Sequence, residues 1–198
     1  MIFFDIDTQN DFMDPEGSLY IKDSERIKRG LKGILEFAGR HGITVVSTKD
    51  WHSPDDPEFE EFPPHCIHFE WGSERFLPHL PTITRGKVVF PNSSLKPEVW
   101  MNSNAHFTVY KKTFSPFSNP WLRKVRDAGY FKQENCVIFG VATDYCVKAT
   151  VEDLTGYCKK ISVLTDVIAG VDRDASRECL KDFLDKGIHL TDWRSLNA

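Results

Sequence analysis

Short apolar runs alternate along the chain with segments of helical periodicity. Six of these runs are rich in β-branched or aromatic residues and hold few polar positions, which is typical of strands buried on both faces of a sheet. They lie at residues 1–6, 43–48, 87–90, 106–111, 136–141 and 160–165. We therefore expect six short strands.

Four other segments repeat apolar residues three or four positions apart, as amphipathic helices do. Gly42, Gly129 and Gly187 follow three of them as stop signals. The segments lie at residues 27–38, 121–128, 144–158 and 175–184. The alternation of strands and helices predicts an α/β fold of three αβα layers, Rossmann-like, with a central, mostly parallel six-stranded sheet and helices on both faces.

The stretch from about residue 50 to residue 86 does not fit this alternation. It is rich in aromatic, proline and histidine residues and shows little periodicity. A long irregular segment inside a compact domain is usually a functional loop. Because 198 residues suffice for one domain with a sizeable core, we expect a single domain over residues 1–198 that contains this loop.

Composition and charge narrow the classes of partner. The formal charge is −4, and residues of both signs are interspersed without a long block of one sign. We therefore expect neither nucleic acid nor a membrane as partner, and no run approaches the roughly 20 apolar residues of a membrane span. The start, MIFFDID, has no basic segment and does not resemble a signal peptide. Five cysteines without a CxxC motif are typical of a reduced protein, so we expect a cytoplasmic location.

Several polar residues stand at or just beyond the ends of predicted strands. Ligands of an open parallel sheet bind beyond the carboxyl ends of its strands. Four polar groups should meet there: Asp7, Asp50, Lys111 and Cys146. Taken singly, each has an ordinary explanation, such as a strand-end turn for Asp7 and a solvated surface charge for Lys111 or its neighbour Lys112.

Cys146 lies just past a strand, at the first turn of a predicted helix. Free N–H groups at a helix N-terminus stabilise a thiolate, so they should lower the pKa of this thiol, and they can also stabilise an oxyanion. The histidine signatures of papain-type and caspase-type enzymes are absent. The candidate proton acceptor is therefore Asp7, with the Lys111 ammonium stabilising the thiolate. A buried structural cysteine is the alternative, and it is our interpretation of Cys136, Cys158 and Cys179.

The irregular loop carries a second set of chemically active side chains. Asp50 and His52 are two positions apart at a strand end, Glu58 follows them, and His65 lies in FPPHC. Carboxylates and imidazoles together suit Zn, Fe or Mn rather than Mg or Ca. Hydrogen-bonding loop histidines are the alternative, because the same stretch also holds His68 and His79. Cys66 could act as a soft ligand, but we expect a structural role for it.

Several segments taken together resemble a known family. DTQNDF at residues 7–12 resembles the opening of nicotinamidase/pyrazinamidase enzymes, TKDWH and FPPHC resemble their metal loop, YKKTFSPF their lysine segment and GVATDYCV their nucleophile segment. The segments occur in the expected order and span most of the chain. The chain is thus similar to the nicotinamidase/pyrazinamidase family of the isochorismatase-like cysteine hydrolases, and the resemblance implies that hydrolase fold.

The resemblance implies catalytic roles for the strand-end groups. Asp7, Lys111 and Cys146 would form the catalytic triad. Lys111 takes this role rather than its neighbour because a serine follows it four residues on. The Val141–Ala142 peptide bond is expected to be cis, and the backbone N–H groups of Ala142 and Cys146 would form the oxyanion hole.

The resemblance also implies one divalent metal ion, zinc before iron or manganese. Its ligands would be Asp50, His52, Glu58 and His65, which makes residues 50–86 a metal-binding and lid loop. Aromatic side chains that would sandwich a flat substrate ring are Phe12, Phe62, Phe114 and Tyr145. The family often has Trp, Tyr and His at the last three positions, so the resemblance leaves the amide substrate open.

The activity implied by the resemblance is hydrolysis of nicotinamide to nicotinate and ammonia through a thioacyl-enzyme intermediate. That reaction belongs to NAD salvage and pyridine nucleotide biosynthesis. Two alternatives remain: a related cysteine hydrolase of another small amide or ureido compound, and a catalytically silent binding protein on the same fold. The isochorismatase reaction itself needs no cysteine nucleophile, so Cys146 argues against it. The expected partner is a small-molecule amide, and a homo-oligomer is left open.

Overall fold

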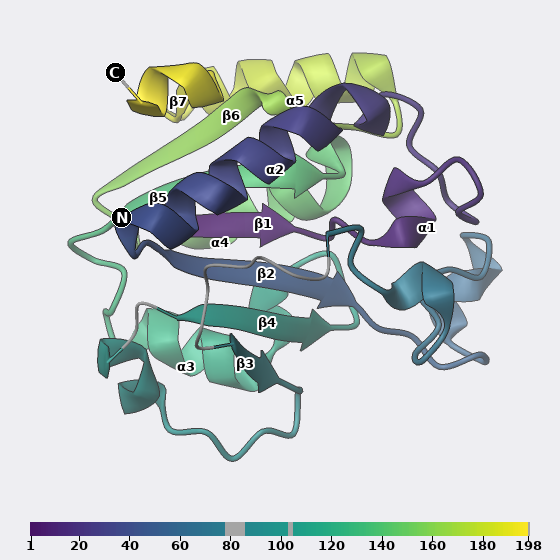
Figure 1. Ribbon diagram of the computed structural model, residues 1–198, viewed down its shortest axis with the longest axis horizontal. Helices are drawn as coiled ribbons and strands as arrows, with labels where there is room; N and C mark the ends of the chain where they lie inside the picture. The colour runs from purple at the N-terminus through teal and green to yellow at the C-terminus, as the bar shows by residue number, and fades with distance from the viewer. Residues whose placement is uncertain (78–85, 103–104, 198) are drawn as a thin grey trace.

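The computed structural model describes residues 1–77, 86–102 and 105–197 (Figure 1). Strands in these residues form one sheet in the order β3-β4-β2-β1-β5-β6-β7, and every neighbouring pair is parallel. They are β1 (Ile2–Ile6), β2 (Thr44–Asp50), β3 (Gly86–Val89), β4 (His106–Lys111), β5 (Asn135–Val141), β6 (Lys160–Ala169) and β7 (His189–Thr191). The predicted α/β class and parallel sheet are confirmed.

The prediction of six strands was wrong by one, because β7 carries almost no pattern. It is three residues long, lies at the edge of the sheet beside β6, and contains one strongly apolar residue, Leu190. All three of its residues are at least partly exposed. An edge strand this short needs no apolar run, and its place is set by pairing with β6.

Helices cover both faces of the sheet, as predicted. In Figure 1, α2 crosses in front of the sheet, and α3 and α4 lie behind it. One buried cluster joins α1 and α2 to the first face, and the other joins α3, α4 and α5 to the second. The helices are α1 (Asn10–Met13), α2 (Ser24–His41), α3 (Pro120–Asp127), α4 (Lys148–Leu154) and α5 (Arg173–Asp185).

The long helix α2 shows how the sequence specifies these layers. Ile27, Leu31 and Ile34 recur on one face and are completely buried, and each such side chain contributes about 1.5–3 kcal/mol by leaving water. The helix ends at Gly42, which has the left-handed φ of 62° that glycine adopts without steric cost. This turn leads the chain directly into β2, beside β1.

The third predicted helix differs from its expected range of 144–158. The chain forms a π-helical turn over Thr143–Val147 and then the short helix α4, which ends at Leu154. Thr155 is extended and Gly156 has a φ of +83°, so the last predicted residues belong to a turn. π-turns inside helices are frequent at functional sites.

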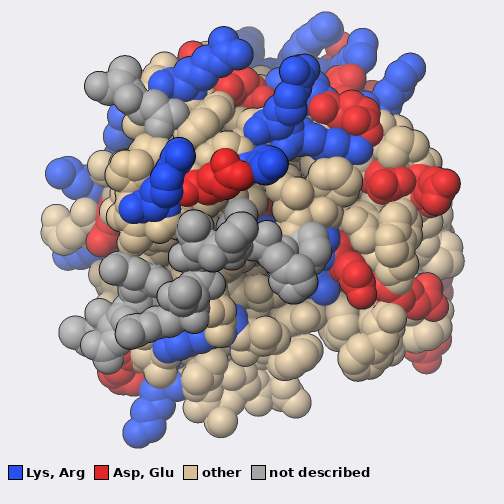
Figure 2. Space-filling view, in the orientation of Figure 1, with Lys and Arg blue, Asp and Glu red and all other residues tan. Residues whose placement is uncertain are grey.

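The carboxyl ends of the strands lie together at the right in Figure 1, where α1 and the described part of the irregular loop, up to residue 77, also lie. Figure 2, in the same orientation, shows Lys and Arg interspersed with Asp and Glu over the upper part of the visible surface. Among the described residues, no helix is long and apolar enough to cross a membrane.

Candidate active site and metal centre

The carboxyl ends of four adjacent strands, β4, β2, β1 and β5, carry the predicted strand-end groups. Asp50 ends β2 and pairs in register with Lys111, which ends β4. Asp7 directly follows β1, and Cys146 lies in the π-turn after β5. The sequence expectation that these groups converge is confirmed by their contacts.

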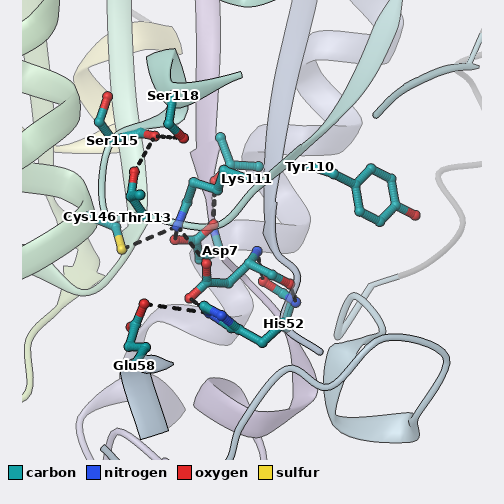
Figure 3. Close-up of polar contacts among 12 residues, drawn as sticks. Asp7, His52, Glu58, Tyr110, Lys111, Thr113, Ser115, Ser118 and Cys146 are labelled. Atoms are coloured by element: carbon teal, nitrogen blue, oxygen red, sulfur yellow. Dashed lines mark hydrogen bonds and ion pairs between the residues drawn. The ribbon is translucent and has the colours of Figure 1, made fainter. Parts of the chain in front are cut away.

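Lys111 contacts all three of the other strand-end groups (Figure 3). Its Nζ lies 2.8 Å from Asp7 Oδ2 and 3.2 Å from Asp50 Oδ1, and it donates a hydrogen bond to Cys146 Sγ at 3.5 Å. The side chain is fully buried. The neighbouring Lys112 side chain is 54% exposed and reaches only Asp56, at 3.8 Å. The structure therefore places Lys111, rather than Lys112, among these groups.

Asp7 is held from both its backbone and its side chain. Thr48 Oγ1 donates to Asp7 Oδ1 at 2.6 Å and accepts the Asp7 N–H at 3.0 Å. The residue has a φ of 45°, which is uncommon outside glycine. The hydrogen bonds of Thr48 on the adjacent strand fix this backbone and point the second carboxylate oxygen toward Lys111.

Burial shapes the protonation of the nucleophile and its neighbour. Burial raises the pKa of the Cys146 thiol well above its usual range, and the nearby Lys111 charge opposes this only in part. Burial likewise raises the pKa of Asp7, against the lowering effect of Lys111. The expected lowering of the thiol pKa was therefore wrong, because desolvation outweighs the favourable charge. Because the Cys146 thiol keeps its proton, it needs a base before it can act as a nucleophile. The Asp7 carboxylate lies beside it, and its raised pKa makes it a better proton acceptor.

Lys111 and Asp50 keep opposite charges despite their burial. Burial alone would lower the pKa of Lys111, but Asp50 and Asp7 raise it well above its usual range. Burial alone would raise the pKa of Asp50, but Lys111, followed by the two histidines nearby, holds it far below its usual range. The site thus contains a stable ammonium between two carboxylates.

The segment before Cys146 brings its backbone close to β1. Gly140 has a φ of +110°, and a Cβ there would lie 2.2 Å from the Ile6 carbonyl oxygen. Glycine is therefore required where β5 passes Ile6, just before Asp7. The Val141–Ala142 peptide bond is cis, as the resemblance led us to expect. The Val147 N–H donates to the Ala142 carbonyl at 3.0 Å and closes the π-turn that presents Cys146.

Four side chains beside this triad form a cluster that could hold a metal ion. One donor atom from each of Asp50, His52, Glu58 and His65 lies within 4.8 Å of the other three. Asp50 Oδ2 is 3.1 Å from His52 Nε2 and 3.5 Å from His65 Nε2. Glu58 contributes oxygens 3.9 Å from each of these nitrogens. All four predicted ligands are thus brought together, including Glu58 from the irregular loop.

The environment of both histidines fits a metal ion. His65 Nδ1 lies 2.8 Å from the Pro63 carbonyl, so it carries the proton and leaves Nε2 with a free lone pair. His52 Nδ1 lies 3.2 Å from Asp56 Oδ2, and His52 Nε2 is buried without a hydrogen bond. A carboxylate or carbonyl behind the second ring nitrogen is the usual support of a metal-binding histidine. The donor set and these unpartnered nitrogens fit a divalent transition metal.

Two positioning residues in this region were missed in the sequence analysis. Gln9 accepts the Asp50 N–H at 2.7 Å and donates to the Asp50 carbonyl at 2.8 Å. Asp11 Oδ2 accepts the Cys66 N–H at 2.6 Å, next to His65. Both belong to the DTQNDF segment, and their polar side chains beside a buried strand end were the only signal.

The remaining loop candidates lie elsewhere. His68 contacts the rings of Trp51 and Phe69 and is not part of the metal cluster. Cys66 is buried, and burial raises the pKa of its thiol. It also stays outside the cluster, in agreement with the structural role expected for it. His79 lies outside the described residues.

A largely apolar pocket opens over Asp7, Cys146 and the metal cluster. Asp7, Cys146, Asp50, Glu58 and His65 line its polar end. All four predicted aromatic residues line it as well: Phe12, Phe62, Phe114 and Tyr145. The last three meet edge to face, with ring centroids 5.2–6.3 Å apart. The pocket can hold a small flat molecule with one end against the thiol.

Comparison with known proteins identifies the family of the chain. The isochorismatase domain family matches residues 1–195, and the chain belongs to that family. It is 30% identical over 193 residues to a nicotinamidase/pyrazinamidase of Mycobacterium tuberculosis, covering 93% of this chain and 95% of that protein. It is 25% identical over 185 residues to a probable inactive nicotinamidase of Arabidopsis thaliana, covering 92% of this chain and 87% of that protein.

Solved structures share the fold. The crystal structure of a pyrazinamidase of Pyrococcus horikoshii in complex with zinc is 22% identical and has a TM-score of 0.76. The match covers 96% of this chain and 98% of that one. The predicted family and fold class are thereby confirmed.

Proposed function

We propose that the protein is a metal-dependent cysteine amidohydrolase that hydrolyses nicotinamide to nicotinate and ammonia. The observation that carries this proposal is the buried Lys111, whose ammonium joins the Cys146 thiol, the Asp7 carboxylate and the metal-cluster residue Asp50. The predicted enzyme class, a nicotinamidase-like amidohydrolase, agrees with the mycobacterial relative, which is itself a nicotinamidase/pyrazinamidase.

Asp50, His52, Glu58 and His65 would hold the metal ion, and we propose zinc. The zinc complex of the Pyrococcus pyrazinamidase supports this choice, as do the nitrogen and oxygen donors of the cluster. Such an ion supplies a Lewis acid that can hold the ring nitrogen of the substrate. The irregular loop at about residues 50–86 is on this proposal the metal-binding and lid loop of a single domain over residues 1–198.

Acylation begins with proton transfer from Cys146 to Asp7. The thiolate, beside the Lys111 ammonium, attacks the carboxamide carbon, and the C=O electrons move onto its oxygen. The backbone N–H groups of Ala142 and Cys146 stabilise that oxyanion. Asp7 then gives its proton to the departing nitrogen, ammonia leaves, and the acyl group remains on Cys146 as a thioester.

Deacylation uses the same residues in reverse order. Asp7 takes a proton from water, and the resulting hydroxide attacks the thioester carbon. The C–S bond breaks, nicotinate is released, and Asp7 returns the proton to Cys146. Lys111 stays protonated throughout, because Asp50 and Asp7 raise its pKa well above its usual range.

The pocket favours a flat ring over a flexible polar substrate. The Phe12 ring lies next to the His65 ring, with their centroids 5.5 Å apart, and the Phe62 ring lies next to the Tyr145 ring. A pyridine ring between these side chains would place its carboxamide over Cys146. In the cytoplasm, this activity would serve NAD salvage and pyridine nucleotide biosynthesis.

A catalytically silent binding protein is the second candidate, because the Arabidopsis relative is named as a probable inactive nicotinamidase. The two candidates differ in the reactivity of Cys146. An enzyme of the proposed type exchanges protons between Cys146 and Asp7, so iodoacetamide should label Cys146 and nicotinamide should protect it. A silent protein should leave Cys146 unlabelled at neutral pH.

The proposal is tested by measuring ammonia and nicotinate released from nicotinamide by the zinc-loaded protein. Cys146→Ala should abolish release, whereas Cys179→Ala, which removes a buried cysteine of α5 outside the pocket, should retain it. A ureido compound tested in parallel distinguishes a related cysteine hydrolase. Absence of nicotinamide turnover by the zinc-loaded wild type contradicts the proposal.

A further inference from the structure

A pair of close sulfur atoms lies at the opposite end of β5 from the Cys146 thiol. Cys136 is the second residue of β5, and Cys158 lies in the turn between α4 and β6. Their Sγ atoms are 2.8 Å apart, although both cysteines are free thiols in this structure. A disulfide bond is about 2.05 Å long, so the two sulfur atoms need to approach by only roughly 0.8 Å to form one. A buried structural role was expected for each of them from the sequence, and the structure places the two side by side.

The backbone around both cysteines already holds them in place. Asn135 and Cys136 of β5 pair in register with Lys160 and Ile161 of β6. The Lys159 N–H also donates to the Glu134 carbonyl at 3.0 Å. Backbone hydrogen bonds thus join the chain at residues 134–136 to the chain just after Cys158. A covalent bond between the sulfur atoms would follow an existing contact rather than create one.

The two thiols differ in their access to solvent. Cys136 is completely buried, whereas Cys158 is partly exposed. The hydrogen bond to Cys158, together with burial, raises the pKa of Cys136. Cys158 is therefore the thiol that a reagent from solvent reaches first, and Cys136 is positioned directly behind it to react second.

We propose that Cys136 and Cys158 form a reversible disulfide by exchange with a low-molecular-weight disulfide such as glutathione disulfide. The Cys158 thiolate attacks one sulfur of the reagent, which forms a mixed disulfide and releases one small thiol. Cys136 then attacks Cys158 Sγ, the bond to the small thiol breaks, and the proton of Cys136 passes to the departing thiolate, which leaves as the second small thiol. The two cysteines are oxidised, and the reagent is reduced to two thiols.

The bond would close a loop over residues 136–158. This loop contains most of β5, the Val141–Ala142 peptide, Cys146 and all of α4. Closing it removes conformational freedom from the unfolded chain, so the oxidised protein should be more stable. Neither cysteine lines the pocket, so the bond would leave the groups around Cys146 in place.

The pair is tested on the full chain incubated with glutathione disulfide and then digested without reduction. Mass spectrometry should find a peptide linked through Cys136 and Cys158, lighter by two hydrogen atoms than the reduced peptides together. The melting temperature should rise by roughly 6–12 °C for a loop of this length. Dithiothreitol should remove both the linked peptide and the rise.

Two variants separate the pair from other cysteine chemistry. Cys158→Ser should keep the fold and lose both the linked peptide and the rise in melting temperature. Cys179→Ser, the matched control for a buried cysteine on α5, should behave as the wild type does. Glutathione attached to Cys158 alone, or both thiols still open to alkylation after denaturation, would overturn the proposal. Because the peptide map uses the wild-type protein, this outcome does not depend on the folding of any variant.

Discussion

The side-chain amide of Gln9 forms hydrogen bonds to both backbone groups of Asp50. Its oxygen accepts the Asp50 N–H at 2.7 Å, and its nitrogen donates to the Asp50 carbonyl at 2.8 Å and to the Ser73 carbonyl at 3.0 Å. Gln9 is completely buried just beyond the end of β1. This one side chain thus joins the end of β2 to the irregular loop, and it holds Asp50 through the backbone rather than through a ligand atom of the metal cluster.

Gln9→Ala should weaken metal binding and lower stability. The substitution leaves the Asp50 N–H and two carbonyl groups buried without partners, at about 1–3 kcal/mol for each such group. Loss of an outer hydrogen bond to a ligand typically costs about 10- to 100-fold in metal affinity. Competition with a chelator measures the affinity, and urea unfolding of the metal-free protein measures the stability. Gln133→Ala, at an exposed position, is the control and should change neither.

Lys111→Met should remove activity and destabilise the protein. Without the ammonium, the carboxylates of Asp7 and Asp50 remain buried and uncompensated, which costs about 3–5 kcal/mol. Loss of the charge beside the thiolate should lower kcat by roughly 10²- to 10³-fold or more. Lys112→Met is the matched control, because that side chain is 54% exposed. Equal effects of the two substitutions on activity would contradict the role assigned to Lys111.

Asp56→Asn tests the support behind His52. Asp56 Oδ2 lies 3.2 Å from His52 Nδ1 and orients the ring so that Nε2 faces the cluster. The neutral amide should reduce metal affinity by roughly tenfold or more, while the fold is kept. Isothermal titration of the metal-free protein with zinc measures this. Asp55→Asn, at an exposed position, should bind zinc as the wild type does; a loss of affinity there as large as at Asp56 would show a general charge effect instead.

His106 should make stability depend on pH. Burial, followed by the Arg75 charge, lowers the pKa of His106 to about 3, and its ring meets Ser47 Oγ at 2.7 Å. The folded state thus holds a neutral histidine, whereas the unfolded chain binds a proton near pH 6.5. The stabilisation is complete above that value and is lost as pH falls from about 6.5 toward 3, by about 1.4 kcal/mol per pH unit.

The comparison of wild type with His106→Gln isolates this effect. Urea unfolding at pH 7.5 and pH 5 should show a larger loss of stability in the wild type than in the variant, which has no titrating group there. The sign follows from the lowered pKa of His106 in the fold. A wild type that loses no more stability than the variant over this range would contradict the buried, neutral state of His106.

Much of the fold could be predicted from the sequence because its inner strands are buried on both faces. Continuous runs such as Ile2–Ile6 and Asn135–Val141 leave little choice but a covered parallel sheet. The short edge strand β7 could not be predicted in this way, because its position depends on pairing with β6 rather than on its own residues. The π-turn before α4 was also missed, since its apolar pattern is that of a regular helix.

The candidate site could be predicted as far as its residue types and their places at strand ends. The observed order of β4, β2, β1 and β5 brings Asp7, Asp50, Lys111 and Cys146 together, and the sequence analysis did not predict that order. The support provided by Gln9 and Asp56 could not be predicted, because each acts through a contact distant in the chain or across a loop. The pKa of Cys146 was predicted with the wrong sign, because desolvation depends on packing that the sequence does not state.

The most direct test of the central claim, that Cys146 carries the acyl group, is the partitioning of products by hydroxylamine. The zinc-loaded protein is given nicotinamide or N-methylnicotinamide in the presence of hydroxylamine, and nicotinohydroxamate and nicotinate are quantified. A shared thioester on Cys146 predicts the same ratio of hydroxamate to acid from both amides, because both leaving groups have departed before the partition. Ratios that differ between the two amides, or turnover that survives in Cys146→Ala, would contradict it.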